Sequence, residues 1–157
     1  MSKYLDLSVN LVTKLIIAIA INLSVIFPAM AISQKLEFDS TAGYKVEATF
    51  SYQETEHQPI IKERGKGKTQ IIDSMRVSFY QPSGELIETY DNIVDGEVTG
   101  NYFEFNYDPA TKQILDNIDL GGESAGEMYL KGSVDGDLSL IKVSNSGEES
   151  VISTFIK

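Results

Sequence analysis

Cysteine is absent from the 157-residue chain, and histidine occurs only once, as His57. The absence of cysteine excludes disulfide bonds, metal sites built on thiolates and a cysteine nucleophile. It also excludes lipoprotein processing, which requires a cysteine at the cleavage point. The fold must therefore be stabilised by its core alone, and this favours a regular, well-packed β-structure.

Basic residues are also scarce, with 13 lysines and arginines against 23 aspartates and glutamates and a net charge of −10. An acidic surface repels the phosphates of nucleic acids and the headgroups of an anionic membrane. We therefore expect no nucleic-acid partner for this protein.

Long apolar runs are limited to one, residues 15–27, which follows Lys14 and has the sequence LIIAIAINLSVIF. Pro28 ends the run, and Ala29 and Ala31 then supply the small residues that a signal peptidase recognises. A charged start, an apolar segment of this length and an A-x-A site are typical of a secretory signal peptide. We predict cleavage after Ala31.

This prediction divides the chain into a signal peptide at residues 1–31 and a single domain at residues 32–157. The domain is expected to be exported to the periplasm, the extracellular space or an equivalent lumen. The alternative is a membrane anchor, but a spanning helix needs about 20 apolar residues, and Asn22, Ser24 and Pro28 lie inside any such window. No second apolar run follows, so we expect no stable membrane anchor after cleavage.

Alternating apolar and polar residues dominate the domain from Tyr44 onward. In residues 44–52 one face carries aromatic and aliphatic side chains, and the other face carries Lys, Glu, Thr and Ser. This period of two is typical of a half-buried strand. Similar patterns predict strands at residues 44–52, 70–80, 85–90, 98–107, 113–120, 127–134, 138–144 and 151–156.

Turn-forming residues separate these strands: Pro82-Ser83-Gly84, Asp95-Gly96, Asp108-Pro109, Gly121-Gly122, Asp135-Gly136 and Asn145-Ser146-Gly147. Proline presets φ, and glycine and asparagine tolerate positive φ. No stretch outside the signal peptide has helical periodicity. We therefore predict an all-β domain, an antiparallel meander of about eight strands that forms a small barrel of lipocalin or avidin size or a sandwich.

One hairpin can be examined residue by residue. A three-residue loop at Asp135–Asp137 pairs Val134 with Leu138. Farther from the turn, the apolar residues pair better when the register is shifted by one residue. The sequence therefore predicts a β-bulge near Lys131 and Gly132, which would bend the sheet.

The segment Gly122–Gly126, with the sequence GESAG, fits the pattern G-x-S-x-G. Over these residues it resembles the nucleophile elbow of the carboxylesterase family of α/β-hydrolases. The resemblance implies Ser124 as nucleophile on a turn between a strand and a helix, with an acid and a histidine later in the chain. Here a strand-like pattern follows Gly126, and His57 precedes the serine. We therefore interpret the segment as a glycine-rich turn, with a small hydrolase using Ser124 and His57 as a further alternative.

Four basic residues lie within seven positions of an otherwise acidic domain: Lys62, Arg64, Lys66 and Lys68. One interpretation is a solvated hairpin loop. The other is a recognition site for an anionic partner, because this is the only concentration of positive charge that the sequence offers.

Oxygen-rich segments are candidates for calcium: Asp91, Asn92, Asp95 and Glu97; Asp116, Asn117 and Asp119; and Asp135 with Asp137. Calcium takes about six to eight oxygen ligands, and none of these segments has the spacing of an EF-hand loop. We therefore expect ordinary acidic turns and no cofactor, and the weak metal-site candidates are Asp91, Asp95 and Glu97.

The densest aromatic stretch is residues 102–107, with the sequence YFEFNY. Phe103, Phe105 and Tyr107 share one face of the strand predicted there. These side chains either belong to the core or line a cavity for an apolar ligand, because an eight-stranded barrel is just wide enough to hold one small molecule.

These observations leave three classes of function. The favoured one is a non-enzymatic binding or interaction module outside the cytoplasm, with an unknown protein or small ligand as partner. The alternatives are a carrier of small apolar ligands built like a lipocalin and, further behind, a small hydrolase.

Overall fold

The computed structural model describes residues 31–54 and 59–155. In this part of the chain the fold is all-β, as predicted, with thirteen strands and no helix. The predicted signal peptide lies outside the described residues apart from Ala31, and His57 lies outside them as well.

The strands form two antiparallel sheets. The first has the order β1 (Ala31–Asp39), β2 (Lys45–Gln53), β5 (Ile72–Tyr80), β6 (Leu86–Val94), β7 (Glu97–Val98) and β4 (Gly67–Lys68). The second has the order β13 (Glu149–Phe155), β12 (Leu138–Val143), β11 (Met128–Ser133), β10 (Asn117–Gly121), β8 (Glu104–Asp108) and β3 (Ile61–Arg64), with β9 (Gln113–Ile114) also paired to β8.

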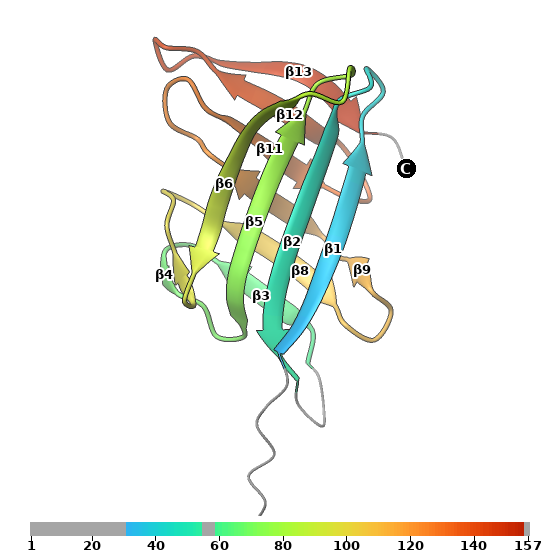
Figure 1. Cartoon of the computed structure of the whole chain (residues 1–157), viewed down its shortest axis with the longest axis vertical. Helices are drawn as coiled ribbons and strands as arrows, with labels where there is room; N and C mark the ends of the chain where they lie inside the picture. Colours follow the sequence, from blue (N-terminus) through green and yellow to red (C-terminus); the bar gives the residue numbers. More distant parts are fainter. Residues whose placement is uncertain (1–30, 55–58, 156–157) are drawn as a thin grey trace, which may run out of the picture.

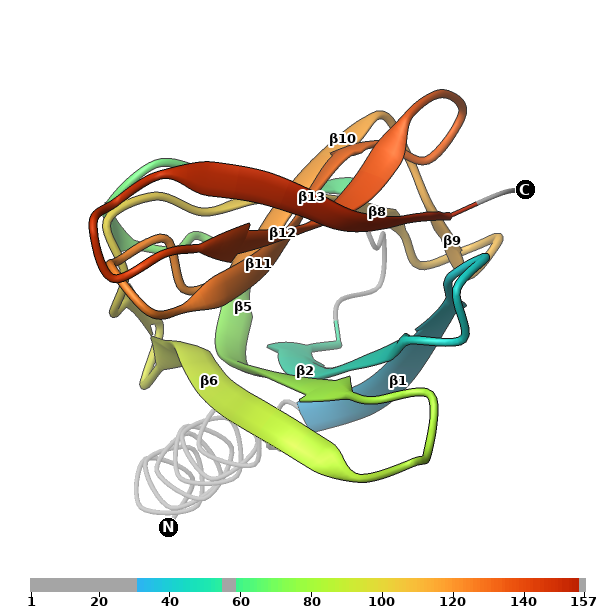
Figure 2. The same ribbon diagram turned by 90° about the horizontal axis from the view of Figure 1, so that it is seen from above.

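The two sheets face each other across one core. The strands of the second sheet cross behind those of the first, and the two layers are separate when viewed from above (Figures 1 and 2). Each sheet is an open path of strands, so the described residues form no closed barrel. The order is not a pure meander, because β3 leaves the first sheet after β2 and pairs with β8 in the second.

The core follows from the alternation read in the sequence. Inward positions of β2 carry Val46, Ala48 and Phe50, all buried. The ring of Phe50 lies 4.9 Å from that of Phe105 and 5.0 Å from that of Tyr107, in edge-to-face contacts across the two sheets. Such contacts stabilise a core beyond the burial of apolar area.

Several predicted strand boundaries were wrong. The predicted strand 98–107 is divided into β7 and β8, and the predicted strand 113–120 into β9 and β10. Asp116 interrupts the second of these with a φ of 53°. β1 was missed. It is an edge strand on which intermediate and exposed residues alternate, and Gln34 interrupts the apolar positions Ile32, Leu36 and Phe38 on its less exposed face.

The segment that carries the basic residues is not a hairpin loop. Residues 61–64 form β3 in the second sheet, and residues 67–68 form β4 in the first. The segment therefore crosses from one sheet to the other, and only Gly65 and Lys66 lie outside a strand.

The predicted bulge near Lys131 and Gly132 was also wrong. β11 and β12 pair without interruption, with Gly132 opposite Leu138. Residues 134–137 connect the two strands, so the loop is longer than three residues, and Leu130 lies opposite Leu140 without an extra residue. The shift in register lies instead between β12 and β13, at Leu140 and Ile141.

Candidate functional site

The first sheet is joined to the second by a buried side chain that forms hydrogen bonds with the backbone of the second sheet. Asn92 on β6 is 2% exposed. Its Nδ2 donates to the carbonyl oxygen of Gly121 at 2.8 Å, and its Oδ1 accepts from the Gly121 N–H at 3.0 Å. Next to it, the Tyr90 hydroxyl accepts from the backbone N–H of Met128 at 3.1 Å. β6 is thereby fixed to β10 and β11.

Close packing at this junction explains the first glycine of the G-x-S-x-G pattern. A Cβ atom on Gly122 would lie 2.5 Å from Cε1 of Tyr90 and 2.5 Å from Oε2 of Glu127. Both distances are shorter than van der Waals contact, so a side chain here would displace the Tyr90 ring and the Glu127 carboxylate. Gly122 therefore permits the close packing of β6 against this turn.

A polar cavity of about 320 Å³ opens beside the junction. Its walls come from three segments: residues 90–92 of β6, residues 99–102 after β7, and residues 121–124 with Glu127 at the turn between β10 and β11. Two tyrosine rings and several oxygen- and nitrogen-bearing side chains line it. The cavity thus lies where the sheets are held together by hydrogen bonds.

Ser124 lies on the rim of this cavity, on a turn between two strands. Its N–H donates to Oε2 of Glu127 at 2.7 Å, and β11 begins at Met128. The carboxylesterase elbow places the serine between a strand and a helix, and the described chain has a strand in the place of that helix. The other residue of the hydrolase alternative, His57, lies outside the described residues.

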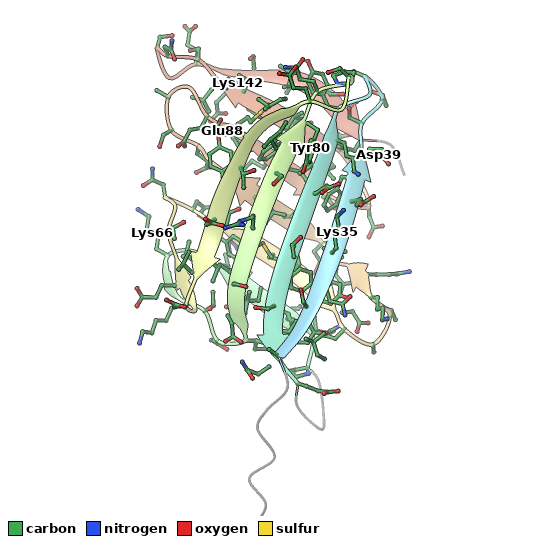
Figure 3. The ribbon with its side chains drawn as sticks, viewed as in Figure 1. Lys35, Asp39, Lys66, Tyr80, Glu88 and Lys142 are labelled. Carbon is green, nitrogen blue, oxygen red and sulfur yellow. The ribbon has the colours of Figure 1, made fainter. Side chains whose placement is uncertain are left out.

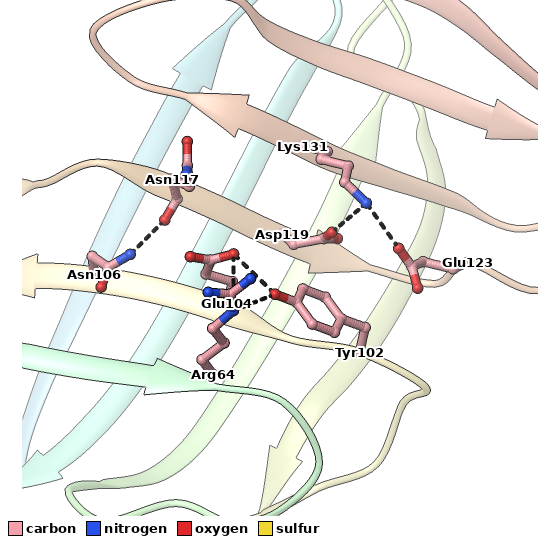
Figure 4. A network of polar contacts seen from close by, with 8 residues as sticks. All are labelled: Arg64, Tyr102, Glu104, Asn106, Asn117, Asp119, Glu123 and Lys131. Atoms are coloured by element: carbon pink, nitrogen blue, oxygen red, sulfur yellow. Dashed lines mark hydrogen bonds and ion pairs between the residues drawn. The ribbon is translucent and has the colours of Figure 1, made fainter.

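Charged side chains form a row across the outer face of the second sheet (Figure 4). Successive register positions place Arg64 opposite Glu104, Glu104 opposite Asp119, and Asp119 opposite Lys131. Arg64 Nε lies 3.7 Å from Oε2 of Glu104 and donates to the Tyr102 hydroxyl at 2.7 Å. Tyr102 lines the polar cavity, so the row reaches its wall.

Lys131 connects the row to the cavity on the other side. Its Nζ lies 2.9 Å from Oδ2 of Asp119 and 3.5 Å from Oε1 of Glu123, a cavity residue. The ammonium group also lies 5.9 Å from the centre of the Tyr102 ring and 5.5 Å from that of Tyr129. These distances are within the range of cation–π attraction, so Lys131 is held from several directions.

Asp119 is the buried member of this pair, with 3% of the residue exposed. The pKa of its carboxyl is raised to about 6, chiefly by burial; the nearby Glu123 and Glu104 also raise it, and Lys131 opposes the shift. The carboxylate raises the pKa of the Lys131 ammonium. The Lys131 contact therefore does not fully compensate the cost of keeping a charged Asp119 away from water.

We expect Asp119 to make stability depend on pH. Below pH 3.8, the ordinary pKa of an aspartate, the carboxyl is protonated in both the folded and the unfolded chain. Its contribution to the free energy of unfolding is then fully present. That contribution is lost as the pH rises through about 6, because the unfolded chain releases the proton more readily. A difference of about two pKa units corresponds to about 3 kcal/mol.

The measurement is urea unfolding of the wild type and Asp119→Asn. The free energy of unfolding of the wild type should gain about 2 kcal/mol relative to this variant between about pH 7.5 and about pH 4.5. Asp137→Asn, which removes an exposed carboxylate, should show no such gain. Parallel pH profiles for the wild type and Asp119→Asn would contradict the prediction.

The basic residues predicted as a binding site are all exposed: Lys62, Arg64, Lys66 and Lys68. Arg64 is engaged by Glu104 and Tyr102, as described above. The three lysines form no ion pair with any described residue, and Lys66 projects outward at the side of the molecule (Figure 3).

The backbone that carries these lysines is fixed by a buried acid that sequence reasoning did not single out. Glu63 is 6% exposed, and its Oε1 accepts from the N–H groups of Gln70 and Ile71, each at 2.8 Å. The N–H of Thr69 donates to the carbonyl oxygen of Gly96 at 2.8 Å. A glutamate at an inward position of β3 was the only sequence signal for this role.

The acidic residues considered for calcium are dispersed. Asp91 lies on β6 with its Oδ1 2.6 Å from Nε of Arg76, Asp95 forms a turn with a φ of 51°, and Glu97 lies on β7. Asn92, taken with them as a loop residue, belongs instead to the continued strand β6. Among residues 31–54 and 59–155, no group of three or more histidine, aspartate or glutamate side chains could hold a metal ion.

Phe103, Phe105 and Tyr107 all point into the core and are at most 1% exposed. They line neither the polar cavity nor a second, more apolar groove on the opposite side of the molecule. This groove has a volume of about 400 Å³ and lies between β1 and the ends of β9, β12 and β13. The rings of Phe38 and Phe155 meet at its wall, 6.4 Å apart.

No helix in the part of the chain that the structure describes is long and apolar enough to cross a membrane. Comparison of the chain with protein-family models, with curated proteins and with solved structures finds no match in any of the three. The function therefore has to be inferred from the geometry described above.

Proposed function

We propose that this protein is an exported, non-enzymatic binding module that recognises an acidic surface of a partner protein through residues 62–68. One observation carries the proposal: Lys62, Lys66 and Lys68 are exposed and unpaired among the described residues, on a backbone that the buried Glu63 holds in place. The facing sheets would serve as a sandwich-type scaffold for this segment.

Rigidity of the backbone favours binding. A flexible loop loses conformational entropy when it engages a partner, whereas a loop that is already ordered avoids most of that cost. The hydrogen bonds from Gln70 and Ile71 to Glu63 order this segment before binding. Lysine side chains on it keep their own flexibility and can adapt to the positions of carboxylates.

The charge of the rest of the chain favours a specific orientation. With a net charge of −10, most of the surface repels an acidic partner. Residues 62–68 form the patch through which such a partner can approach. Charge patterns of this kind contribute more to orientation and association rate than to affinity.

Export is part of the proposal and is supported by the signal-peptide pattern in residues 1–31. Cleavage after Ala31 would remove only the first residue of β1, which spans Ala31–Asp39. The remaining residues of β1 pair with β2 from Ile32 opposite Tyr52 to Asp39 opposite Lys45. The processed chain would therefore keep its edge strand.

The double variant Lys66→Glu/Lys68→Glu is expected to weaken binding to poly-L-glutamate, a defined acidic probe, by about tenfold or more, a loss of about 1.4 kcal/mol. The melting temperature should stay nearly unchanged, because both side chains are exposed and unpaired among the described residues. Binding by the wild type should also fall at about 1 M salt, where charges are screened within about 3 Å.

The matched control is Lys112→Glu/Lys157→Glu, which changes the net charge by the same amount outside residues 62–68. This control should retain most of the affinity. Equal losses in the two double variants would show that only net charge matters, and absence of binding by the wild type at low salt would also overturn the proposal. Cross-linking in the exported fraction would then identify the natural partner.

The apolar groove supports a second candidate, a carrier of small apolar ligands. Leu36 and Phe38 from β1, Ile114 from β9 and Phe155 from β13 contribute to its lining. Its volume is within the usual range of small-molecule sites, about 300–1,000 Å³. Lipophilic material that copurifies with the wild type and is absent from Phe38→Glu would favour this carrier over the protein-binding module.

A further inference from the structure

We propose that the polar cavity beside Asn92 is a second, separate binding site, and that it takes a neutral polyhydroxylated ligand, a saccharide ring. Residues 62–68 contact the cavity lining through the bond from Arg64 to Tyr102, but the proposal does not depend on the function proposed for that segment. It rests on the shape of the cavity, on the groups that line it and on the charge balance of its walls.

The cavity has the size and rigidity of a small-molecule site. Its volume of about 320 Å³ is at the lower end of the range of about 300–1,000 Å³ that such sites occupy. The two bonds between Asn92 and Gly121 and the bond from Met128 to Tyr90 connect its walls. The cavity is thus formed before any ligand binds, which lowers the entropic cost of binding.

The aromatic lining suits the apolar face of a sugar ring. Tyr90 and Tyr102 both line the cavity, and each has its hydroxyl already engaged, Tyr90 by Met128 and Tyr102 by Arg64 and Glu104. With the hydroxyls fixed, the orientations of the rings are fixed as well. A tyrosine ring offers a large rigid apolar surface beside a polar group, and a pyranose ring offers C–H groups beside hydroxyls.

Polar groups without an internal partner remain available to a ligand. The side-chain amide of Asn101 and the hydroxyl of Ser124 both belong to the lining, and neither forms a hydrogen bond with any described residue. An amide supplies both donors and an acceptor, and a hydroxyl supplies one donor and accepts. Such groups match the neighbouring hydroxyls of a saccharide, each of which can donate and accept.

The charge balance favours a neutral ligand. Three carboxylates line the cavity, but each already has a partner: Asp91 has Arg76 at 2.6 Å, Glu123 has Lys131 at 3.5 Å, and Glu127 accepts from the Ser124 N–H at 2.7 Å. The electrostatic attraction of a cation to the cavity is therefore weaker than it would be with three unpaired carboxylates. An anion would meet these carboxylates with no lysine or arginine in the lining to bind it.

The test is saturation-transfer NMR on the purified protein with glucose, galactose, N-acetylglucosamine, cellobiose, lactose and chitobiose as probes, and with putrescine and inorganic phosphate as charged probes. At least one saccharide should bind. In the wild type, the backbone amides that shift on titration should be those of residues 99–102 and 121–127. This mapping locates the site without relying on any variant.

Asn101→Ala/Ser124→Ala should raise the dissociation constant of that saccharide at least tenfold, about 1.4 kcal/mol. The matched control Ser83→Ala/Asn145→Ala, at two turns outside the lining, and Lys66→Glu/Lys68→Glu should leave it unchanged. The proposal is overturned if no saccharide binds, if the shifts map elsewhere, if the first variant binds as the wild type does, or if only putrescine or phosphate binds.

Discussion

Asn92→Ala is expected to lower the free energy of unfolding by about 2–4 kcal/mol, because it leaves two buried backbone groups without partners. These groups are the N–H and the carbonyl of Gly121, which both bond to the Asn92 amide. A buried polar group that loses its hydrogen bond destabilises the fold by its full desolvation penalty, whereas an exposed group forms a new hydrogen bond with water.

The matched control is Asn106→Ala. Asn106 has the same side chain and also bonds to a backbone group, donating from Nδ2 to the carbonyl oxygen of Asn117 at 2.8 Å, but this bond is exposed (Figure 4). Water can replace it, so the loss should stay within about 1 kcal/mol. Urea unfolding of the two variants measures the difference. Similar losses in both would show that Asn92 does not join the sheets as described.

Hydrogen exchange offers a local readout of the same junction. In the wild type the amide of Gly121 is protected by Asn92, so its exchange should be slow. In Asn92→Ala it should accelerate more than the amides of β2, which pair with neighbouring strands and do not depend on this contact. Local opening of this kind is the expected behaviour of a region held by few contacts.

Gly132→Ala is expected to destabilise the protein by about 3 kcal/mol or more, which places it among the strongest single substitutions. Gly132 has a φ of 132°, and an added Cβ would lie 2.0 Å from the carbonyl oxygen of Asp137. The obstacle is backbone, which cannot rotate away as a side chain can. The pairing of Gly132 with Leu138 would have to break.

Gly147→Ala separates the two causes of this loss. Gly147 also has a positive φ, 85°, but an added Cβ would meet nothing within 4 Å. The free energy of unfolding should therefore fall only by the cost of holding alanine in the left-handed conformation, about 1–2 kcal/mol. Thermal and urea unfolding of both variants provide the comparison. If Gly147→Ala is as damaging as Gly132→Ala, close backbone approach at Gly132 is not the reason.

The candidate sites were only partly visible in the sequence. The concentration of lysines in residues 62–68 is a local pattern, but the role of Glu63 depends on the backbone of Gln70 and Ile71 being folded back onto it. Gly122 and Ser124 attracted attention as part of a catalytic pattern. Their place in the structure is the wall of a polar cavity, and Gly122 leaves room there for the side chains of Tyr90 and Glu127.

The sequence by itself determined the all-β class and most of the turns, because both depend on neighbours along the chain. Alternation places Val46 and Phe50 on one side of β2 whatever the rest of the protein does. Residues such as Gly84 and Gly96, with φ of 85° and 74°, form their turns because glycine accepts these angles at little cost.

Only the tertiary structure decided how the two sheets are joined and where the cavity forms. In the sequence, Asn92 was grouped with acidic residues of a turn as a candidate calcium ligand. Nothing near it in the sequence indicates a buried strand residue. Its partner, Gly121, is 29 residues away along the chain. A buried amide is stable only when its hydrogen bonds are satisfied, and the groups that satisfy them come together only when β6 and β10 meet.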